Sequence, residues 1–253
     1  MAELQRPGGE LASRPLHFFW MVDCSGSMFS EGKIGTVNNA IQECIPEMVS
    51  AADNNPNAQL LVRALQFSTG ASWITANPVP IEDYAWEDME ANGVTDMGKA
   101  FELLAAQLGI PPMPARALPP VIVLLSDGQP TDDYKKGLDK LKALPWFKKA
   151  VKIAISIGQD ADDDVLLEFT GNRELVLQAN NPTALVKMIK WASTTASMVS
   201  APASKPMNSA PVSTPAGVAP ADDPFAPANN GAPLVLDMSN IPNPDDFDEG
   251  AVW

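Results

Sequence analysis

Hydrophobic and polar positions follow two alternating patterns between about residues 16 and 198. Short runs that are apolar at nearly every position predict strands covered on both faces. Between them lie stretches with apolar residues three or four positions apart, the spacing of one face of a helix. This alternation predicts an α/β fold with a mostly parallel sheet.

The predicted strands and helices alternate along the chain. Strands are expected at 16–22, 60–67, 72–75, 121–125, 151–157 and 174–177. Helices are expected at 32–52, 95–108, 132–143, 160–169 and 182–197. Only a tight turn at Thr69 and Gly70 separates the second strand from the third, and so short a connection permits only antiparallel pairing. We therefore expect one short antiparallel strand at the edge of the sheet.

Residue types near two helix starts and in one loop give local predictions. Thr131 is expected to cap the helix that follows it, with Asp132 and Asp133 in the first turn, where acids are favourable. Asp96 is expected to cap the preceding helix, although it could also assist a site in the same loop. The stretch 110–120 contains five prolines and predicts an extended surface loop.

The composition changes towards the C-terminus. Of the last 53 residues, ten are proline, ten are alanine and seven are acidic, while only one is basic. Such a stretch has too little apolar surface to order itself, so we predict an acidic tail at 201–253. The tail follows a predicted domain at 14–200, and an N-terminal extension at 1–13 precedes that domain. Within this tail, 201–231 is expected to be a disordered, flexible linker. The stretch 233–253 is either more of a solubilising tail or a short docking segment.

Charge and cysteine usage narrow the function classes. Acidic residues outnumber basic ones by 31 to 17, a net charge of −14, which argues against nucleic-acid binding through phosphate contacts. The sequence contains no uncharged apolar run of about 18 residues that would predict a membrane span. The N-terminus lacks an apolar signal core, so we expect a cytoplasmic protein. Cys24 and Cys44 are expected to be small buried residues rather than a disulfide. The single histidine, His17, is expected to be structural.

The first predicted strand stops at an acid that two hydroxyls follow. Asp23 ends the apolar run, and Ser25 and Ser27 stand two and four positions later. The strand would bring Asp23 to the carboxyl edge of the sheet, where open α/β sheets bind ligands. Gly26 is expected to let the backbone turn tightly so that the three side chains converge. Three hard oxygen donors suit Mg²⁺ better than zinc, which prefers nitrogen and sulfur.

This pattern resembles the metal-ion-dependent adhesion site (MIDAS) of von Willebrand factor A domains, in which a distant Thr and a distant Asp complete an Asp-x-Ser-x-Ser motif. Thr95, before a helical pattern, and Asp127, after an apolar strand, match those two residues. The resemblance covers about 14–200. It implies a three-layer, doubly wound von Willebrand factor A fold that binds Mg²⁺, with Mn²⁺ or Ca²⁺ as alternatives. The implied metal site consists of Asp23, Ser25, Ser27, Thr95 and Asp127.

The resemblance also implies what completes the coordination. In the family, the hydroxyls bind the metal directly and the acids bind it directly or through water, while an Asp or Glu of a protein partner fills the last position. A doubly charged cation lets such a partner approach an acidic protein. The chain's own tail is a further candidate partner, in cis or in trans, because a tether raises the effective concentration of its acids. Those acids are Asp237, Asp245, Asp246, Asp248 and Glu249.

A second stretch narrows the resemblance. The run Ser-Asp-Gly-Gln-Pro-Thr-Asp-Asp-Tyr at 126–134 looks like the TerY-like subgroup associated with bacterial tellurium resistance. That likeness implies a role in bacterial signalling or stress response, beside a protein kinase and a PP2C-type protein phosphatase.

Two other classes of function stay open. A metal-dependent phosphohydrolase would use Asp23 as its nucleophile, but enzymes of the haloacid dehalogenase type need a second acid at the position of Ser25. A single histidine at a strand start cannot complete a nucleophile and base pair, so we expect no catalysis. An extracellular adhesin would need secretion, which the missing signal core and disulfides disfavour.

Overall fold

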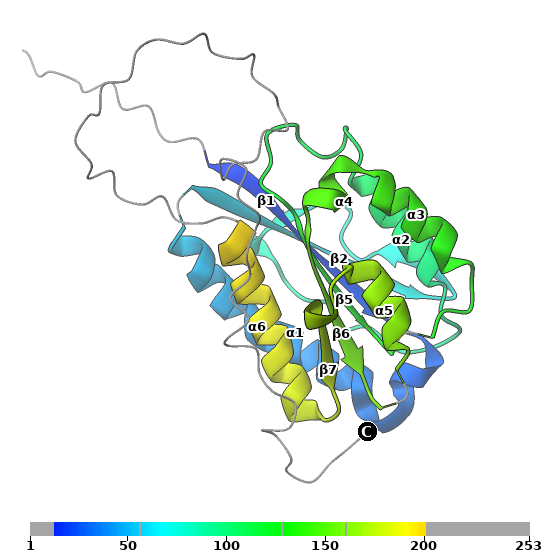
Figure 1. The fold of residues 1–253 in the computed structure, drawn as a ribbon. Coiled ribbons are helices and arrows are strands. Elements are labelled where there is room, and N and C mark those ends of the chain that lie inside the picture. Colours follow the sequence, from blue (N-terminus) through cyan, green and yellow to red (C-terminus); the bar gives the residue numbers. More distant parts are fainter. Residues whose placement is uncertain (1–12, 56, 128, 160, 201–253) are drawn as a thin grey trace, which may run out of the picture.

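The protein folds into one sheet with helices on both faces (Figure 1). The structure is a computed structural model that describes residues 13–55, 57–127, 129–159 and 161–200, so the predicted linker and docking segment lie outside the described residues. The strands are β1 (Arg14–Asp23), β2 (Ala58–Ser68), β3 (Gly70–Trp73), β4 (Val79–Pro80), β5 (Val121–Ser126), β6 (Val151–Ile157) and β7 (Val176–Ala179). The α-helices are α1 (Lys33–Asp53), α2 (Met97–Gln107), α3 (Tyr134–Ala143), α4 (Pro145–Lys149), α5 (Asp163–Thr170) and α6 (Pro182–Ser200). The 3-10 helices are η1 (Gly26–Gly32), η2 (Ile81–Asp83) and η3 (Arg173–Leu175).

The strand order β3-β2-β1-β5-β6-β7 confirms the mostly parallel sheet. Neighbouring strands from β2 to β7 pair in parallel, and β3 pairs antiparallel with β2, as the short connection predicted. The two-residue β4 also pairs antiparallel with β2 and was not predicted, because so short a strand has no apolar period. The short α4 was missed too, and it has a proline in its first turn.

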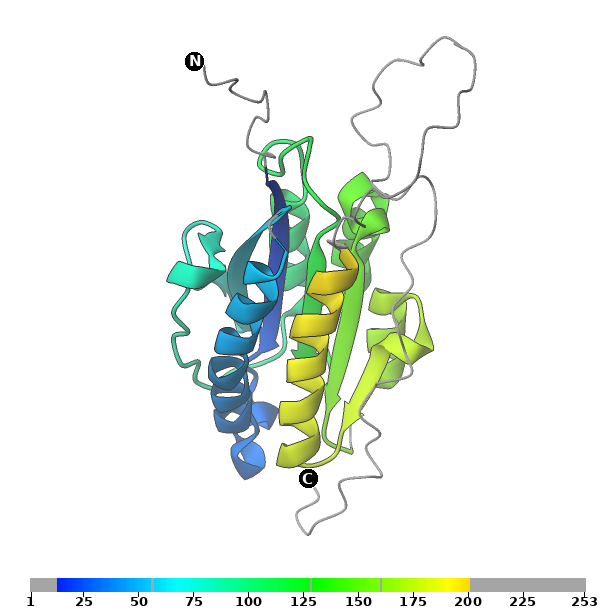
Figure 2. The ribbon, with the colours of Figure 1, turned by 90° about the vertical axis from the view of Figure 1, so that its left-hand side faces the viewer.

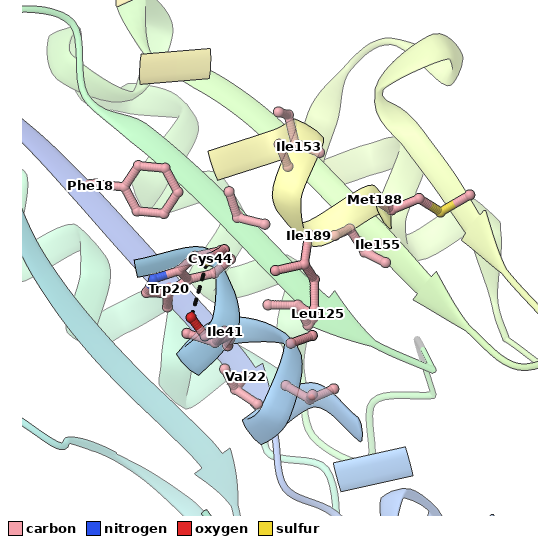
Figure 3. Packing of buried hydrophobic residues seen from close by; sticks show 14 of the residues in the cluster. Phe18, Trp20, Val22, Ile41, Cys44, Leu125, Ile153, Ile155, Met188 and Ile189 are labelled. Atoms are coloured by element: carbon pink, nitrogen blue, oxygen red, sulfur yellow. Dashed lines mark hydrogen bonds between the residues drawn. The ribbon is translucent and has the colours of Figure 1, made fainter. Parts of the chain in front are cut away.

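Two layers of helices enclose the sheet. Helices α1 and α6 lie side by side over one face, while α2, α3, α4 and α5 cover the other (Figures 1 and 2). Alternate side chains of β1 enter opposite layers: Phe18 and Trp20 pack towards α1 and α6, and Phe19 packs towards α2. Figure 3 shows the first of these layers, where the Cys44 thiol donates a hydrogen bond of 3.1 Å to the Ile41 carbonyl. This packing explains the continuous apolar run of β1.

Three sequence-based expectations concern the cysteines, the proline-rich stretch and membrane spans. Cys24 and Cys44 are both buried and unpaired by a disulfide, as predicted. The proline-rich stretch 110–120 is not wholly on the surface, because Met113 and Leu118 are buried and the Leu118 N–H donates to the Pro15 carbonyl at 2.8 Å. None of the helices in the described parts of the chain has the length and hydropathy required of a membrane span.

The topology selects one place for a ligand. The chain runs from β1 outwards through β2 to β3, then returns to the other side of β1 and runs outwards again from β5. Open α/β sheets bind ligands at the carboxyl ends of the two strands where the order reverses. Val22 pairs with Leu125 in the register of β1 and β5, so Asp23 and Ser126 are the next residues at that edge.

Candidate metal centre

Asp23 is fully buried at the end of β1. Its Oδ1 accepts a hydrogen bond from the Ser25 N–H at 2.8 Å, and its Oδ2 accepts one from the Ser126 hydroxyl at 2.6 Å. Burial raises the pKa of the Asp23 carboxyl to about 6; the hydrogen bonds from Ser126 and Ser25 oppose that rise, and the negative charge of Asp127 adds to it. At neutral pH this carboxylate is therefore ionised in a place that favours its neutral form.

Ser25 and Ser27 place two hydroxyls beside this carboxylate. Their Oγ atoms are 2.9 Å apart, with Ser25 buried and Ser27 exposed, so the pair leads from the interior to the surface. Ser25 occupies the N-cap position of η1, yet its side chain makes no capping hydrogen bond. Helix capping therefore does not account for this serine.

The loop after β1 is fastened to the loop before α2. The Gly26 N–H donates to the Gly93 carbonyl at 3.1 Å, and the Asn92 N–H donates to the Cys24 carbonyl at 2.7 Å. Gly26 was expected to allow a tight turn, but it does not adopt a positive φ; a Cβ there would instead lie 3.2 Å from the Gly93 oxygen. Gly93 has a φ of +72°, and a Cβ on it would lie 2.3 Å from Thr69 Oγ1.

Thr95 is buried in the loop before α2 and is held by Thr131. The Thr95 N–H donates to the Thr131 hydroxyl at 3.0 Å, and the Thr131 N–H donates to the Thr95 carbonyl at 2.9 Å. The prediction that Thr131 caps the following helix is wrong. Helix α3 begins at Tyr134 with Asp133 as its N-cap, whose side chain accepts from the Lys136 N–H. Thr131 therefore joins the segment that follows β5 to the loop that carries Thr95.

Asp132 and Asp96 also have partners other than those expected. Asp132 accepts from the N–H groups of Gly98 at 2.9 Å and Lys99 at 3.1 Å, so it caps the start of α2 from the segment before α3. Asp96 occupies the N-cap position of α2 but makes no capping hydrogen bond with its side chain. Its Oδ2 accepts from the Gly70 N–H at 2.8 Å and so holds the turn between β2 and β3.

Helices α2 and α3 touch through glycines. A Cβ on Gly98 would lie 2.8 Å from Asp132 Oδ2, and a Cβ on Gly137 would lie 2.5 Å from the Gly98 carbonyl oxygen. Neither position has room for a larger residue unless the neighbouring backbone shifts. The start of α2, two residues after Thr95, is therefore packed backbone to backbone against α3.

Asp127 follows β5 and supplies the second carboxylate. It is buried, and its backbone carbonyl accepts from the Asp162 N–H at 2.9 Å. Its Oδ1 is buried with no hydrogen-bond partner among the described residues. A buried carboxylate oxygen without a partner is unfavourable, and a second acid close by makes it more so. A bound cation would relieve both costs.

All five predicted ligands thus lie at the carboxyl edge, on three loops that backbone hydrogen bonds join. Ser126 also belongs to the centre and was missed, although a hydroxyl that ends an apolar strand was a usable signal. In the described part of the chain, no three His, Cys, Asp or Glu side chains gather into a group. The donors at this edge are accordingly two carboxylates and several hydroxyls, a set that fits a hard cation such as Mg²⁺.

Comparison with known proteins finds structural likeness without sequence likeness. No family model matches the sequence, and no curated protein matches it. A von Willebrand factor type A protein from Catenulispora acidiphila superposes with a TM-score of 0.55 at 15% identity, covering 73% of this chain and 43% of that one. The ArnB paralog VWA2 from Sulfolobus acidocaldarius gives a TM-score of 0.51 at 19% identity, covering 69% and 45%. Proximal thread matrix protein 1 from the mussel byssus, with a zinc-occupied MIDAS motif, gives 0.53 at 16% identity, covering 74% and 47%.

These likenesses show the von Willebrand factor A fold. The chain spans less than half the length of each of the three solved structures. At such identities, the comparison establishes the architecture, while any metal or partner has to be argued from this chain's own residues.

Proposed function

We propose that the protein is a non-catalytic, Mg²⁺-dependent protein interaction module. Asp23, Ser25, Ser27, Thr95 and Asp127 would hold the cation, and a partner's Asp or Glu would complete its coordination. The observation that carries this proposal is the pair of buried acids at the reversal of strand order, one of them with an unpartnered oxygen. Mn²⁺ and Ca²⁺ also prefer oxygen donors and are the alternatives to Mg²⁺.

The neighbouring groups favour binding over catalysis. The single histidine, His17, lies near the start of β1, at the edge opposite to Asp23. The position two residues after Asp23 is Ser25, so no second acid stands where a phosphohydrolase of the haloacid dehalogenase type would need one. An ionised aspartate needs no base to act as a nucleophile, but such an enzyme still needs an acid–base group for the leaving group, and Asp23 receives its hydrogen bonds from a backbone amide and a hydroxyl.

Charge explains why a metal would be needed for the contact. The chain carries a net charge of −14, and at the centre the negative charge of Asp127 already acts on the carboxyl of Asp23, so a carboxylate from a partner would be repelled. A divalent cation held largely by neutral hydroxyls reverses the sign of the local charge. The finer assignment to a TerY-like protein in the bacterial cytoplasm, working beside a protein kinase and a PP2C-type phosphatase, is part of this proposal and is supported by the sequence at 126–134.

Titration calorimetry on the full chain tests the metal centre. The double variant Ser25→Ala with Ser27→Ala is expected to lose Mg²⁺ binding while remaining folded. Ser30→Ala is the matched control, because Ser30 is an exposed hydroxyl in the same η1 segment. Unchanged Mg²⁺ affinity in the double variant would contradict the proposal.

A capture experiment from cell lysate tests the interaction itself. Partners that the full chain retains in Mg²⁺ are expected to be released by a chelator and not to be retained by the double variant. A kinase or a PP2C-type phosphatase among them would support the finer assignment. Hydrolysis of a small phosphomonoester in Mg²⁺, abolished by Asp23→Asn, would favour the enzyme instead.

A further inference from the structure

We infer that the chain's own C-terminal segment, 233–253, docks in cis on the candidate metal centre. One of its acids would bind the cation, and its apolar side chains would contact Phe29 and Val94. This inference rests on the proposed function, because it names an occupant of the same metal site. The C-terminal segment would then occupy the metal site until an external partner displaces it.

Exposed apolar side chains flank the centre. Among the described residues, three large apolar side chains are exposed: Phe29 at 75%, Ile110 at 49% and Val94 at 46%. Phe29 follows Ser27 by two residues, and Val94 directly precedes Thr95. The hydrogen bond between Gly26 and Gly93 joins the loops that carry them. An apolar rim around a cation suits an occupant that combines a carboxylate with apolar side chains.

The backbone of η1 holds the Phe29 side chain at the surface in a defined conformation. Met28, next to it, is fully buried in the core and anchors the segment. The chain then passes from η1 into α1 through Glu31, with a φ of 55°, and Gly32, with a φ of 70°. Glu31 is the one described residue other than glycine with a positive φ, a conformation that costs energy for a side chain with a Cβ. The exposure of Phe29 is thus part of an ordered turn.

The segment 233–253 has the composition that such a rim requires. It carries five acids and no basic residue, and its apolar residues include aromatic ones next to acids, as in Asp246-Phe247-Asp248. Without a cation this segment would be repelled by an acidic domain. With one, its acid and its aromatic side chain match the two features of the rim. The apolar residues of the segment are Leu234, Val235, Leu236, Met238, Ile241, Phe247, Val252 and Trp253.

The length of the intervening chain fits the distance to be crossed. Helix α6 runs back from β7 and ends at Ser200, at the sheet edge opposite to the centre (Figure 2). Its 19 residues correspond to about 28 Å. The stretch 201–232 contains 32 residues, and a flexible linker of that length has an end-to-end distance of roughly 30 Å. A tether whose length matches the span gives the highest effective concentration at the site.

Paramagnetic broadening by Mn²⁺ in the isotopically labelled full chain tests the docking. If the inference is right, Mn²⁺ broadens the NMR signals of the loops around Ser25 and Thr95 and also those of 233–253, whereas Mg²⁺ broadens neither. Phe29→Ala is expected to restore most of the tail signal while the loops stay broadened. Ile110→Ala is the matched control, because Ile110 is also a large, exposed apolar residue but follows α2 at the opposite edge.

The outcomes separate the two proposals. Broadened loops with an unaffected tail would overturn the docking and leave the metal centre standing. Loops that Mn²⁺ does not broaden would overturn the metal centre itself. Tail broadening that weakens on dilution would overturn docking in cis in favour of contact between chains. Replacing the five acids of the segment by their amides is expected to abolish the tail broadening, and its persistence would also count against the inference.

Discussion

The strand β1 carries one buried titratable side chain near each end, and the two have opposite surroundings. His17, near the start, is 4% exposed, stacks on Phe19 and has no hydrogen-bond partner on either ring nitrogen within the described part of the chain. Asp23, at the end, accepts hydrogen bonds from Ser25 and Ser126 and lies near another acid. Burial alone therefore does not distinguish a functional group from a packed one.

The difference lies in the charge that each group carries at neutral pH. Burial lowers the pKa of His17 to about 4, so this ring is neutral and suits its apolar surroundings. Burial raises the pKa of Asp23 to about 6, which still leaves it ionised at pH 7. One end of β1 is thus stable as it is, while the other holds a charge that a cation would stabilise.

Replacing Asp23 should break the comparison most strongly. In Asp23→Asn, the Mg²⁺ affinity is expected to fall by more than about 100-fold, because a charged ligand or the group that orients its waters is lost. In chelator at pH 7.5, the same variant should be more stable by about 1–3 kcal/mol, since the amide oxygen can accept from the Ser25 N–H and the amide NH2 can donate to the Ser126 hydroxyl, without a buried charge. Calorimetry and urea unfolding measure the two effects.

The control for this variant is Asp139→Asn, which removes an exposed acid of α3. It should change neither quantity appreciably. Lower stability of Asp23→Asn in chelator would show that its buried charge carries no cost.

Replacing His17 should remove a pH dependence of stability. The folded chain keeps His17 neutral down to about pH 4, whereas the unfolded chain protonates it below about 6.5, so stability falls as the pH drops through that window. The loss attributable to this group is up to about 3 kcal/mol. The chain has one histidine, so the difference between wild type and His17→Phe isolates it. Parallel unfolding free energies from pH 7 to pH 4 would refute this account.

Ser126 sharpens the role of the groups around Asp23. In Ser126→Ala, the 2.6 Å hydrogen bond to Asp23 is lost, and the Mg²⁺ affinity is expected to fall about 10- to 100-fold with the fold retained. Ser156 pairs with Ser126 in the register of β5 and β6, but its hydroxyl donates to Asp163 at 2.7 Å. Ser156→Ala is therefore the matched control, and an equal loss of affinity there would argue against a specific role for Ser126.

The smallest expected effect concerns the loop that carries Thr95. Asp132→Ala removes the acceptor for two N–H groups at the start of α2 and should lower stability by about 1–2 kcal/mol. Asp133→Ala removes a single hydrogen bond of 3.4 Å and should lower stability by only a few tenths of a kcal/mol. Chemical unfolding of the two variants gives the comparison, and equal losses would mean that Asp132 does not cap α2.

The sequence alone predicted the strands that end at the centre, because the apolar runs before Asp23 and Asp127 follow directly from burial on both faces. It also placed the antiparallel β3, since the connection at Thr69 and Gly70 is too short for a crossover. These predictions depend on residues that are near one another in the chain. They therefore required no knowledge of the tertiary structure.

The contacts that hold the centre together were not predictable in the same way. Thr131 and Asp132 precede α3 and were assigned to it, yet Thr131 binds Thr95 in the loop before α2, and Asp132 binds the start of α2. Asp96 precedes α2 and binds the turn after β2. Each could have capped its own helix by residue type, and only the approach of the loops decided otherwise. Ser126 likewise gained its role from the pairing of β5 with β1.

The contact between Gly98 and Gly137 limits how Thr95 can move. Neither Gly98 nor Gly137 has a side chain that could rearrange between the two helices at this point, so a displacement of the start of α2, two residues after Thr95, is expected to move α3 with it. Helix α2 is 11 residues long, about 16 Å, and reaches towards the opposite edge of the sheet. A change in how Thr95 binds a ligand at the carboxyl edge of the sheet would accordingly be transmitted to the opposite edge.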